Sequence, residues 1–173
     1  MSGRNHRSRK AAYPKGYRRF ESSRLRRFIT MDREKKIKVK AMCLFNHEGR
    51  TLAARGRDDK KNQIFFRLIG GSVDFGEKAE EGVRREVREE LGCEIENLEF
   101  VDVVENIFEY NGIPGHEVVF LYKGDLSNKA LYEQEKIHII EPYSEFDAEW
   151  VPIEDIKSGK TVLYPTFNYS EIL

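Results

Sequence analysis

Three glutamates lie within five residues in the last third of one segment near the middle of the chain, GGSVDFGEKAEEGVRREVREELG at 70–92. Glu86, Glu89 and Glu90 are spaced i, i+3 and i+4, so a helix would direct their carboxylates toward one region. Carboxylate oxygens grouped in this way are the ligands that hard divalent cations such as Mg²⁺ and Mn²⁺ prefer. The spacing therefore indicates a metal site, and metal-assisted chemistry, on one helix.

A helical wheel places these glutamates relative to the apolar residues of the same segment. At about 100° per residue, one buried stripe contains Ala79, Val83, Val87 and Leu91. The opposite, solvent-facing side carries Glu77, Glu81, Arg84 and Arg88. Glu86 and Glu90 overlap the apolar stripe and Glu89 borders it, although burying unpaired carboxylates is costly. A solvated acidic helix with salt bridges such as Glu81–Arg85 and Arg85–Glu89 is the alternative, but that helix should keep its glutamates opposite the valines.

The residues before and after this helix must bring a strand and a turn close to the glutamates. QIFFRLI at 63–69 is typical of a strand, and it runs directly into Gly70 and Gly71. A backbone without Cβ atoms lets a ligand or a metal approach closely. The helix itself is expected over 77–91, with Gly92 as its stop.

The remaining pattern predicts further strands joined by hairpins and by longer connections. Strands are expected at 37–45, 51–56, 97–110, 116–126 and 148–153. A hairpin loop is expected at 111–115, a polar irregular connection at 127–146, and a short helix opened by Pro152. Strands around a central helix predict an α/β fold with a mixed β-sheet covered by helices.

Length and composition restrict the class of protein. The 173 residues suit one domain with an extension, and a hydrophobic fraction of 39% is enough for a core. Only Cys43 and Cys93 occur, so no disulfide framework is implied, and a reducing, cytoplasmic location is expected. No apolar run approaches the roughly 18 to 20 residues of a membrane span, and no apolar segment typical of a secretory signal follows the basic start.

The net charge of zero hides a basic arm on an acidic domain. Residues 1–31 hold ten Lys or Arg and one acid, and residues 32–173 hold 20 basic and 29 acidic residues. We therefore divide the chain into a flexible arm at 1–31 and a folded domain at 32–173. A basic amphipathic helix in the arm would use Tyr17, Phe20, Leu25 and Phe28. The arm is compatible with a solvated tail, an extension before a start at Met31, a contact with nucleic acid or a membrane surface, or a transit peptide.

The segment at 71–93 resembles the Nudix box of MutT-like hydrolases, with the pattern G-x5-E-x7-R-E-U-x-E-E-x-G-U, where U is a bulky apolar residue. The matching residues are Gly71, Glu77, Arg85, Glu86, Val87, Glu89, Glu90, Gly92 and Cys93. All seven fixed positions match, and Cys93 is a small substitute at the last apolar position. Ile69 stands where the family often has proline. With the flanking strands and EWVPIEDI, the resemblance extends over roughly 36–157.

The resemblance implies a Nudix fold, in which a mixed β-sheet is sandwiched between α-helices. It also implies Mg²⁺- or Mn²⁺-dependent hydrolysis of a diphosphate linkage in a nucleoside diphosphate joined to another group. The implied metal ligands are Gly70, through its carbonyl, and Glu86, Glu89 and Glu90. Arg85 is expected to orient the catalytic helix through Glu77 or Glu89.

The proton acceptor and the substrate contacts are less closely defined. We favour Glu86 as the base within the box, and the acids considered outside it are Glu117, Glu145 and Glu149. Phosphate contacts are assigned to Arg55, Arg57 and Arg67. Base stacking is considered for Phe75, Phe108, Tyr110 and Trp150.

The substrate is expected to be of nucleotide type, such as ADP-ribose, a dinucleoside polyphosphate or a (d)NTP. Some dinucleoside polyphosphate hydrolases of the family carry a tyrosine 16 to 18 residues past the box, and Tyr110 lies 17 residues past Cys93. The proline that many ADP-ribose hydrolases carry about fifteen residues past the box is absent, since Pro114 comes too late. Two alternatives remain: a nucleotide-binding regulatory module, and an RNA-directed enzyme that uses the basic arm. A homodimer is compatible with the family.

Overall fold

The computed structural model describes residues 36–141, 144–169 and 172. The chain divides into two units, Met1–Glu34 and Lys35–Leu173. The amphipathic helix predicted in the basic arm lies outside the described residues. None of the helices in the described part of the chain is long and apolar enough to cross a membrane.

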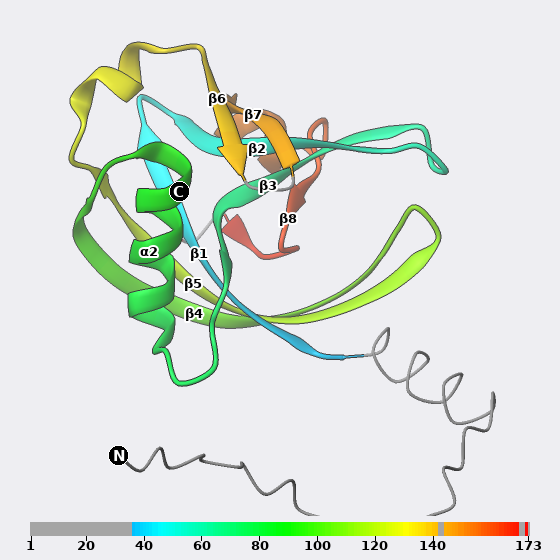
Figure 1. The fold of residues 1–173 in the computed structure, drawn as a ribbon. Helices are drawn as coiled ribbons and strands as arrows, with labels where there is room; N and C mark the ends of the chain where they lie inside the picture. The colour runs from blue at the N-terminus through cyan, green and yellow to red at the C-terminus, as the bar shows by residue number, and fades with distance from the viewer. Residues whose placement is uncertain (1–35, 142–143, 170–171, 173) are drawn as a thin grey trace, which may run out of the picture. The chain divides into compact units, whose positions relative to one another are not determined.

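The described unit is built on one eight-stranded mixed sheet (Figure 1). The strands are β1 Lys38–His47, β2 Arg50–Asp58, β3 Gln63–Ser72, β4 Ile95–Tyr110, β5 Ile113–Leu126, β6 Lys136–Glu141, β7 Ser144–Pro152 and β8 Leu163–Tyr164. Their order is β4-β5-β1-β3-β2-β7-β6, and β8 pairs with β3. Two pairs, β1–β5 and β3–β8, are parallel and the others are antiparallel. The predicted mixed sheet is confirmed.

Apolar side chains of β1 point alternately to the two faces of the sheet and belong to two separate hydrophobic clusters. Cys43 and Phe45 belong to the cluster that includes Val83 and Val87 of helix α2, Ala79–Leu91. This first cluster also contains Leu131 of the 3-10 helix η1, Lys129–Glu133. The second cluster takes Met42 and Leu44 on the other face and is covered by Ile156 of α3, Ile153–Lys157. Helical segments therefore cover both faces of the sheet, which confirms the α/β fold class.

The prediction of an irregular connection at 127–146 was wrong, because this segment contains η1, β6 and the start of β7. Ile137 and Ile139 are buried, whereas the alternate residues His138 and Ile140 face outward. The segment therefore carries the two-residue period of a half-buried strand, and pairing with β7 stabilises it. The polar residues around these isoleucines obscured that period.

The hairpin loop predicted at 111–115 is shorter in the structure. Only Asn111 and Gly112 form the turn, with φ of 51° and 77°, as a two-residue hairpin turn requires. Pro114 already lies in β5, opposite Glu109 of β4. Its missing N–H is tolerated because β1 pairs with β5 only from Glu117 onward.

Two long hairpins, β2–β3 and β4–β5, extend beyond the core on the side away from α2 (Figure 1). The two hairpin tips turn toward each other. Helix α2 lies against β1 and β3 at the opposite end. The fold thus places helix α2 and the two extended hairpins at opposite ends of the same central strands.

Candidate active site

The two glycines at the end of β3 form a cradle against helix α2. Gly70 has a φ of 129°, and a Cβ added there would lie 2.3 Å from the Ala41 carbonyl oxygen. A Cβ on Gly71 would lie 2.2 Å from the Glu86 carboxylate carbon. A larger residue at Gly70 would therefore push β3 away from β1, and one at Gly71 would displace the Glu86 carboxylate.

Two of the three clustered glutamates lie at this cradle, as the helical wheel predicts. Glu90 is 8% exposed, and its Oε2 accepts a hydrogen bond of 3.1 Å from the Gly70 N–H. The Glu86 side chain is 15% exposed and fills the space beside Gly71. Glu89 lies at the outer edge, with its side chain 60% exposed. A solvated acidic helix would leave these carboxylates exposed, whereas Glu90 is buried and Glu86 is half-buried.

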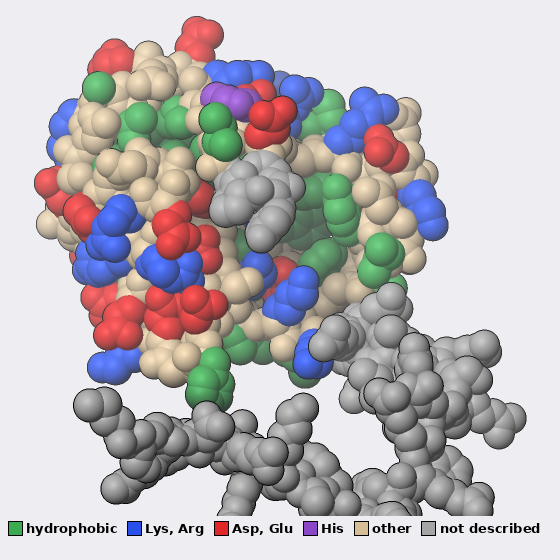
Figure 2. All heavy atoms as spheres, in the orientation of Figure 1, with side chains coloured by type: hydrophobic (Ala, Val, Ile, Leu, Met, Phe, Trp, Pro, Cys, Tyr) green, Lys and Arg blue, Asp and Glu red, His purple; other side chains and the backbone are tan. Residues whose placement is uncertain are grey.

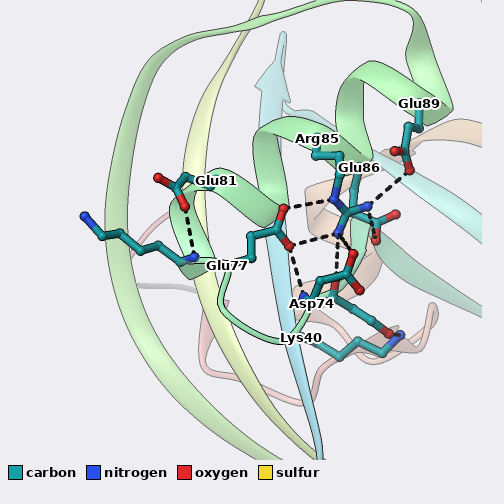
Figure 3. A network of polar contacts seen from close by, with 9 residues as sticks. Lys40, Asp74, Glu77, Glu81, Arg85, Glu86 and Glu89 are labelled. Carbon is teal, nitrogen blue, oxygen red and sulfur yellow. Dashed lines mark hydrogen bonds and ion pairs between the residues drawn. The ribbon is translucent and has the colours of Figure 1, made fainter.

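A single guanidinium, that of Arg85, connects the loop, the helix and the strand (Figure 3). Its Nε and Nη2 donate to the two oxygens of Glu77 at 2.9 and 3.0 Å. Its Nη1 donates to Glu86 and Glu89, each at 3.1 Å, and Nη2 also donates to the Ser72 carbonyl at 2.9 Å. These bonds raise the pKa of Arg85 and lower that of Glu77.

The placement of Glu77 on the solvent face of the helix was wrong. Helix α2 begins at Ala79, so Glu77 lies in the preceding loop, where its side chain is 16% exposed. It accepts the Asp74 N–H at 3.0 Å as well as the bonds from Arg85. Glu81 accepts the Lys78 N–H at 3.1 Å and so serves the start of the helix.

The donor set at the cradle suits a divalent cation in its chemistry. Glu86 and Glu90 supply hard oxygen donors beside a backbone that has no Cβ at two successive positions. In 36–141, 144–169 and 172, no three His, Cys, Asp or Glu side chains converge closely enough to hold a metal as they stand. The Arg85 guanidinium binds Glu86 and Glu89 instead. Glu89, at the exposed edge of the same group, is the third carboxylate that could join this donor set.

A cavity of about 310 Å³ opens between the β2–β3 and β4–β5 hairpins. Figure 2 shows a hollow with hydrophobic side chains on its walls. Its aromatic lining consists of Phe65, Phe108, Tyr110, Phe146 and Tyr164. Its cationic lining consists of Arg55, Lys61 and Arg67. Aromatic walls with a few cations are what a planar base linked to phosphates requires.

Four of the predicted substrate residues line this cavity: Arg55, Arg67, Phe108 and Tyr110. Arg67 also lies over the Phe146 ring, with its Cζ 5.9 Å from the centroid. Arg57 lies elsewhere, because it donates to Asp59 at 3.0 Å and Asn62 at 2.9 Å in the turn of its own hairpin.

The other aromatic candidates are not part of the cavity. Phe75 is fully exposed in the loop before α2. Trp150 is buried in the first core, where its Nε1 donates to the Leu131 carbonyl at 3.1 Å and its ring stacks on Tyr132. Its role is structural.

Of the three acids considered outside the box, the cavity contains Glu117. Glu149 lies 4.0 Å from Arg55 and 3.6 Å from Lys136, in a surface cluster. Glu145 is exposed near His138. Of these three acids, Glu117 is therefore the one that lines the cavity.

Lys40 is a residue that the sequence interpretation missed. Its Nζ donates to the Ser72 hydroxyl at 3.0 Å, directly after the glycine cradle. Its charge interacts with Arg67 and Glu117 of the cavity and with Glu86 of the helix. Burial, followed by the repulsion from Arg67, lowers the pKa of Lys40. Lys40 is thus held at Ser72, the residue after the cradle, and Arg67 of the cavity lining lies five residues earlier on the same strand. Its one sequence signal is a lysine immediately before the apolar run of β1.

Comparisons with known proteins agree with this geometry. A family model described as NUDIX domain matches residues 35–167. The crystal structure of a MutT NUDIX hydrolase from Burkholderia pseudomallei is 25% identical and superposes with a TM-score of 0.54, covering 80% of this chain and 95% of that chain. A MutT protein from Methanosarcina mazei is 24% identical, with a TM-score of 0.50 and coverage of 75% and 86%. A NUDIX hydrolase from Nitrosomonas europaea shares the fold at 15% identity and a TM-score of 0.51, with coverage of 72% and 78%.

Proposed function

Since the NUDIX model spans most of it, the chain belongs to the Nudix hydrolase family, and on that premise we propose that it cleaves a diphosphate linkage in a nucleotide-type substrate with Mg²⁺ or Mn²⁺. The observation that carries the proposal is the burial of Glu86 and Glu90 against the Gly70–Gly71 cradle. Strand β3 carries both this cradle and residues that line the aromatic cavity, Phe65 and Arg67.

The cation would be held by Glu86, Glu89 and Glu90, together with the Gly70 carbonyl. A bound divalent cation lowers the pKa of its water and neutralises charge on the phosphoryl oxygens. That chemistry would lie at the end of β3, three residues beyond Arg67 of the cavity lining. Glu86 is the favoured acceptor of the water proton, and Glu117 is the alternative from the cavity side.

Arg85 acts through the glutamates as a positioning residue. Its four carboxylate bonds fix the loop before α2 against the helix, and its bond to Ser72 fixes the helix against β3. A planar guanidinium is suited to this role because it donates in several fixed directions at once. The orientation of Glu86 therefore depends on Arg85.

The cavity would hold the nucleoside end of the substrate. Phe108 and Tyr110 offer aromatic surfaces for a base, and Arg55, Arg67 and Lys40 offer positive charge for the diphosphate. ADP-ribose, dinucleoside polyphosphates and (d)NTPs all contain such a nucleoside diphosphate unit. All four glutamates of the box are present, which favours hydrolysis over a binding-only regulatory module.

A substrate screen tests the proposal. Purified protein would be incubated with Mg²⁺ or Mn²⁺ and with ADP-ribose, dinucleoside polyphosphates, (d)NTPs and capped RNA, and the products would be separated by chromatography. We expect cleavage of at least one nucleotide, and loss of that cleavage on addition of EDTA. Cleavage of capped RNA alone, lost when residues 1–31 are removed, would instead favour an RNA-directed enzyme. Tight nucleotide binding without cleavage of any substrate would favour the regulatory module.

A further inference from the structure

The tips of the two hairpins are joined by a buried carboxylate. Asp58, the last residue of β2, has a side chain that is 3% exposed. Its Oδ2 accepts the Asn111 N–H at 3.0 Å from the β4–β5 turn. Its Oδ1 accepts the Lys61 N–H at 2.9 Å within the β2–β3 turn. One side chain therefore serves both turns, which are 53 residues apart in sequence.

The β4–β5 turn also accepts hydrogen bonds from the β2–β3 turn. The Asn111 side-chain oxygen accepts the Asp59 N–H at 2.8 Å, and the Lys61 Nζ donates to the Glu109 carbonyl. We call the side chains of Asp58, Lys61 and Asn111, with the backbone groups that they bind, the clasp. Hydrogen bonds to a buried carboxylate are among the stronger ones in proteins, so the clasp should hold two hairpins that would otherwise be flexible at their tips.

The clasp closes the far end of the cavity. Asp58, Lys61 and Glu109 are themselves part of its lining. Phe65 on the β2–β3 hairpin and Tyr110 on the β4–β5 hairpin meet edge to face beside it, with ring centroids 5.7 Å apart. The distance between the aromatic walls is thus set at the point where the hairpin tips are joined.

We propose that the clasp sets the width of the base pocket, which makes Asp58 and Asn111 positioning residues that determine how tightly the substrate's nucleobase is held. This inference rests on the proposed function, since it takes the cavity as the nucleoside site. Asp58 of the clasp pairs with Gln63 at the start of β3, whereas Lys40 pairs with Ser72 at the end of that strand beside the glycine cradle. The clasp therefore acts on binding of the base and leaves the phosphoryl chemistry unchanged. In kinetic terms, opening the clasp should raise KM without lowering kcat.

Two substitutions separate the clasp from ordinary stabilisation of a turn. Asn111→Gly removes the side-chain acceptor for Asp59 but suits the positive φ of 51°, so the hairpin turn remains. Asp58→Asn removes the charge that both turns share. Asp59→Asn is the matched control. Among the residues that the structure describes, its exposed carboxylate pairs only with Arg57 in its own hairpin, while its N–H still donates to the Asn111 side chain. Circular dichroism and thermal unfolding would verify that each variant is folded.

The experiment compares each variant on a cleaved nucleotide and on the matching base-free substrate, ribose 5-diphosphate. For Asp58→Asn and Asn111→Gly we expect the KM of the nucleotide to rise about tenfold, as loss of a charge-assisted or buried hydrogen bond can produce, with kcat within about twofold. The kinetics of the base-free substrate should stay unchanged, and Asp59→Asn should resemble the wild type. An unchanged KM for the nucleotide, or an equal effect on both substrates, would overturn the proposal.

An experiment can separate failure of the clasp proposal from failure of the proposed function. If the wild-type protein cleaves no nucleotide, the function fails, and the clasp is then tested by calorimetric binding of the same nucleotides in Mg²⁺ buffer. A roughly tenfold weaker affinity in the two clasp variants, but not in Asp59→Asn, would support the clasp on its own. Equal affinity in all four proteins, or no nucleotide binding by the wild type, would contradict it.

Discussion

The carboxylate of Glu86 occupies the space into which a side chain on Gly71 would project, since a Cβ there would lie 2.2 Å from the Glu86 Cδ. The conflict is with the end of a flexible side chain, which can move aside without disturbing the backbone. Gly71→Ala should therefore fold normally but lose activity, by about 10- to 100-fold, because Glu86 is displaced. Steady-state kinetics and thermal unfolding of the same sample would measure both effects.

Gly70→Ala provides the contrast, because there the added Cβ would meet the Ala41 backbone oxygen at 2.3 Å and the φ is 129°. We expect a loss of roughly 2 kcal/mol or more in the free energy of unfolding, from strain and overlap. Urea denaturation would measure it. Equal unfolding free energies for Gly70→Ala and Gly71→Ala would show that the two glycines do not have these separate roles.

Arg85 should not be replaceable by lysine. Lysine cannot donate in several fixed directions, so Arg85→Lys would leave the bonds to Glu77, Glu86 and Glu89 only partly made. We predict a fall in kcat of about 10- to 100-fold and a higher Mg²⁺ midpoint. Arg88→Lys is the matched control on the same helix, because Arg88 pairs with Glu94 on the surface. If both variants keep full activity, Arg85 does not orient the helix.

Lys40 should matter for turnover, whereas its neighbour Lys38 should not. Lys40 is held at Ser72, directly after the glycine cradle, and Lys38 is exposed two residues earlier on the same strand. Removal of one charged contact to the diphosphate in Lys40→Gln should lower kcat/KM about 10- to 100-fold. Mn²⁺ affinity should stay unchanged, because Lys40 does not supply a ligand. Similar kinetics for Lys40→Gln and Lys38→Gln would rule out a substrate contact by Lys40.

Stability should fall at acid pH because of Asp58 and Glu77. The Lys61 N–H lowers the pKa of Asp58, and Arg85 lowers that of Glu77. With a native pKa below the unfolded value of about 4, each group favours folding above that pH, and its contribution is lost as pH falls through the native pKa. Denaturation between pH 7 and pH 3 should show a decreasing free energy of unfolding, with a smaller decrease in an Asp58→Asn, Glu77→Gln variant. An equally steep decrease in that variant would contradict the assignment.

Helix α2 was predictable from sequence because the residues that determine it lie within the helix and directly after it. The apolar spacing of α2 places Glu86 and Glu90 at the core, and Gly92 ends the helix in the left-handed conformation. The exact start of the helix was not predictable, because the bonds that hold Glu77 come from Arg85, eight residues away. Local propensity does not reveal such a contact.

The cavity could be predicted only in part, for the same reason. Phe108 and Tyr110 were considered for base stacking, but Phe65, Phe146 and Tyr164 come from three other strands and meet them only in the folded sheet. The clasp joins turns that no short-range pattern relates. The β6 strand was hidden because its two buried isoleucines are surrounded by polar residues.

The central claim is that Glu86 and Glu90 hold a catalytic cation at the glycine cradle. The most direct measurement is Mn²⁺ affinity, determined by electron paramagnetic resonance, together with nucleotide turnover. Both are measured in the wild type and in the variants Glu86→Gln, Glu90→Gln and Glu81→Gln. We predict that the two cradle variants lose Mn²⁺ affinity and turnover together, by at least about tenfold, while Glu81→Gln at the start of the same helix keeps both. Wild-type Mn²⁺ affinity in Glu86→Gln and Glu90→Gln would contradict the account.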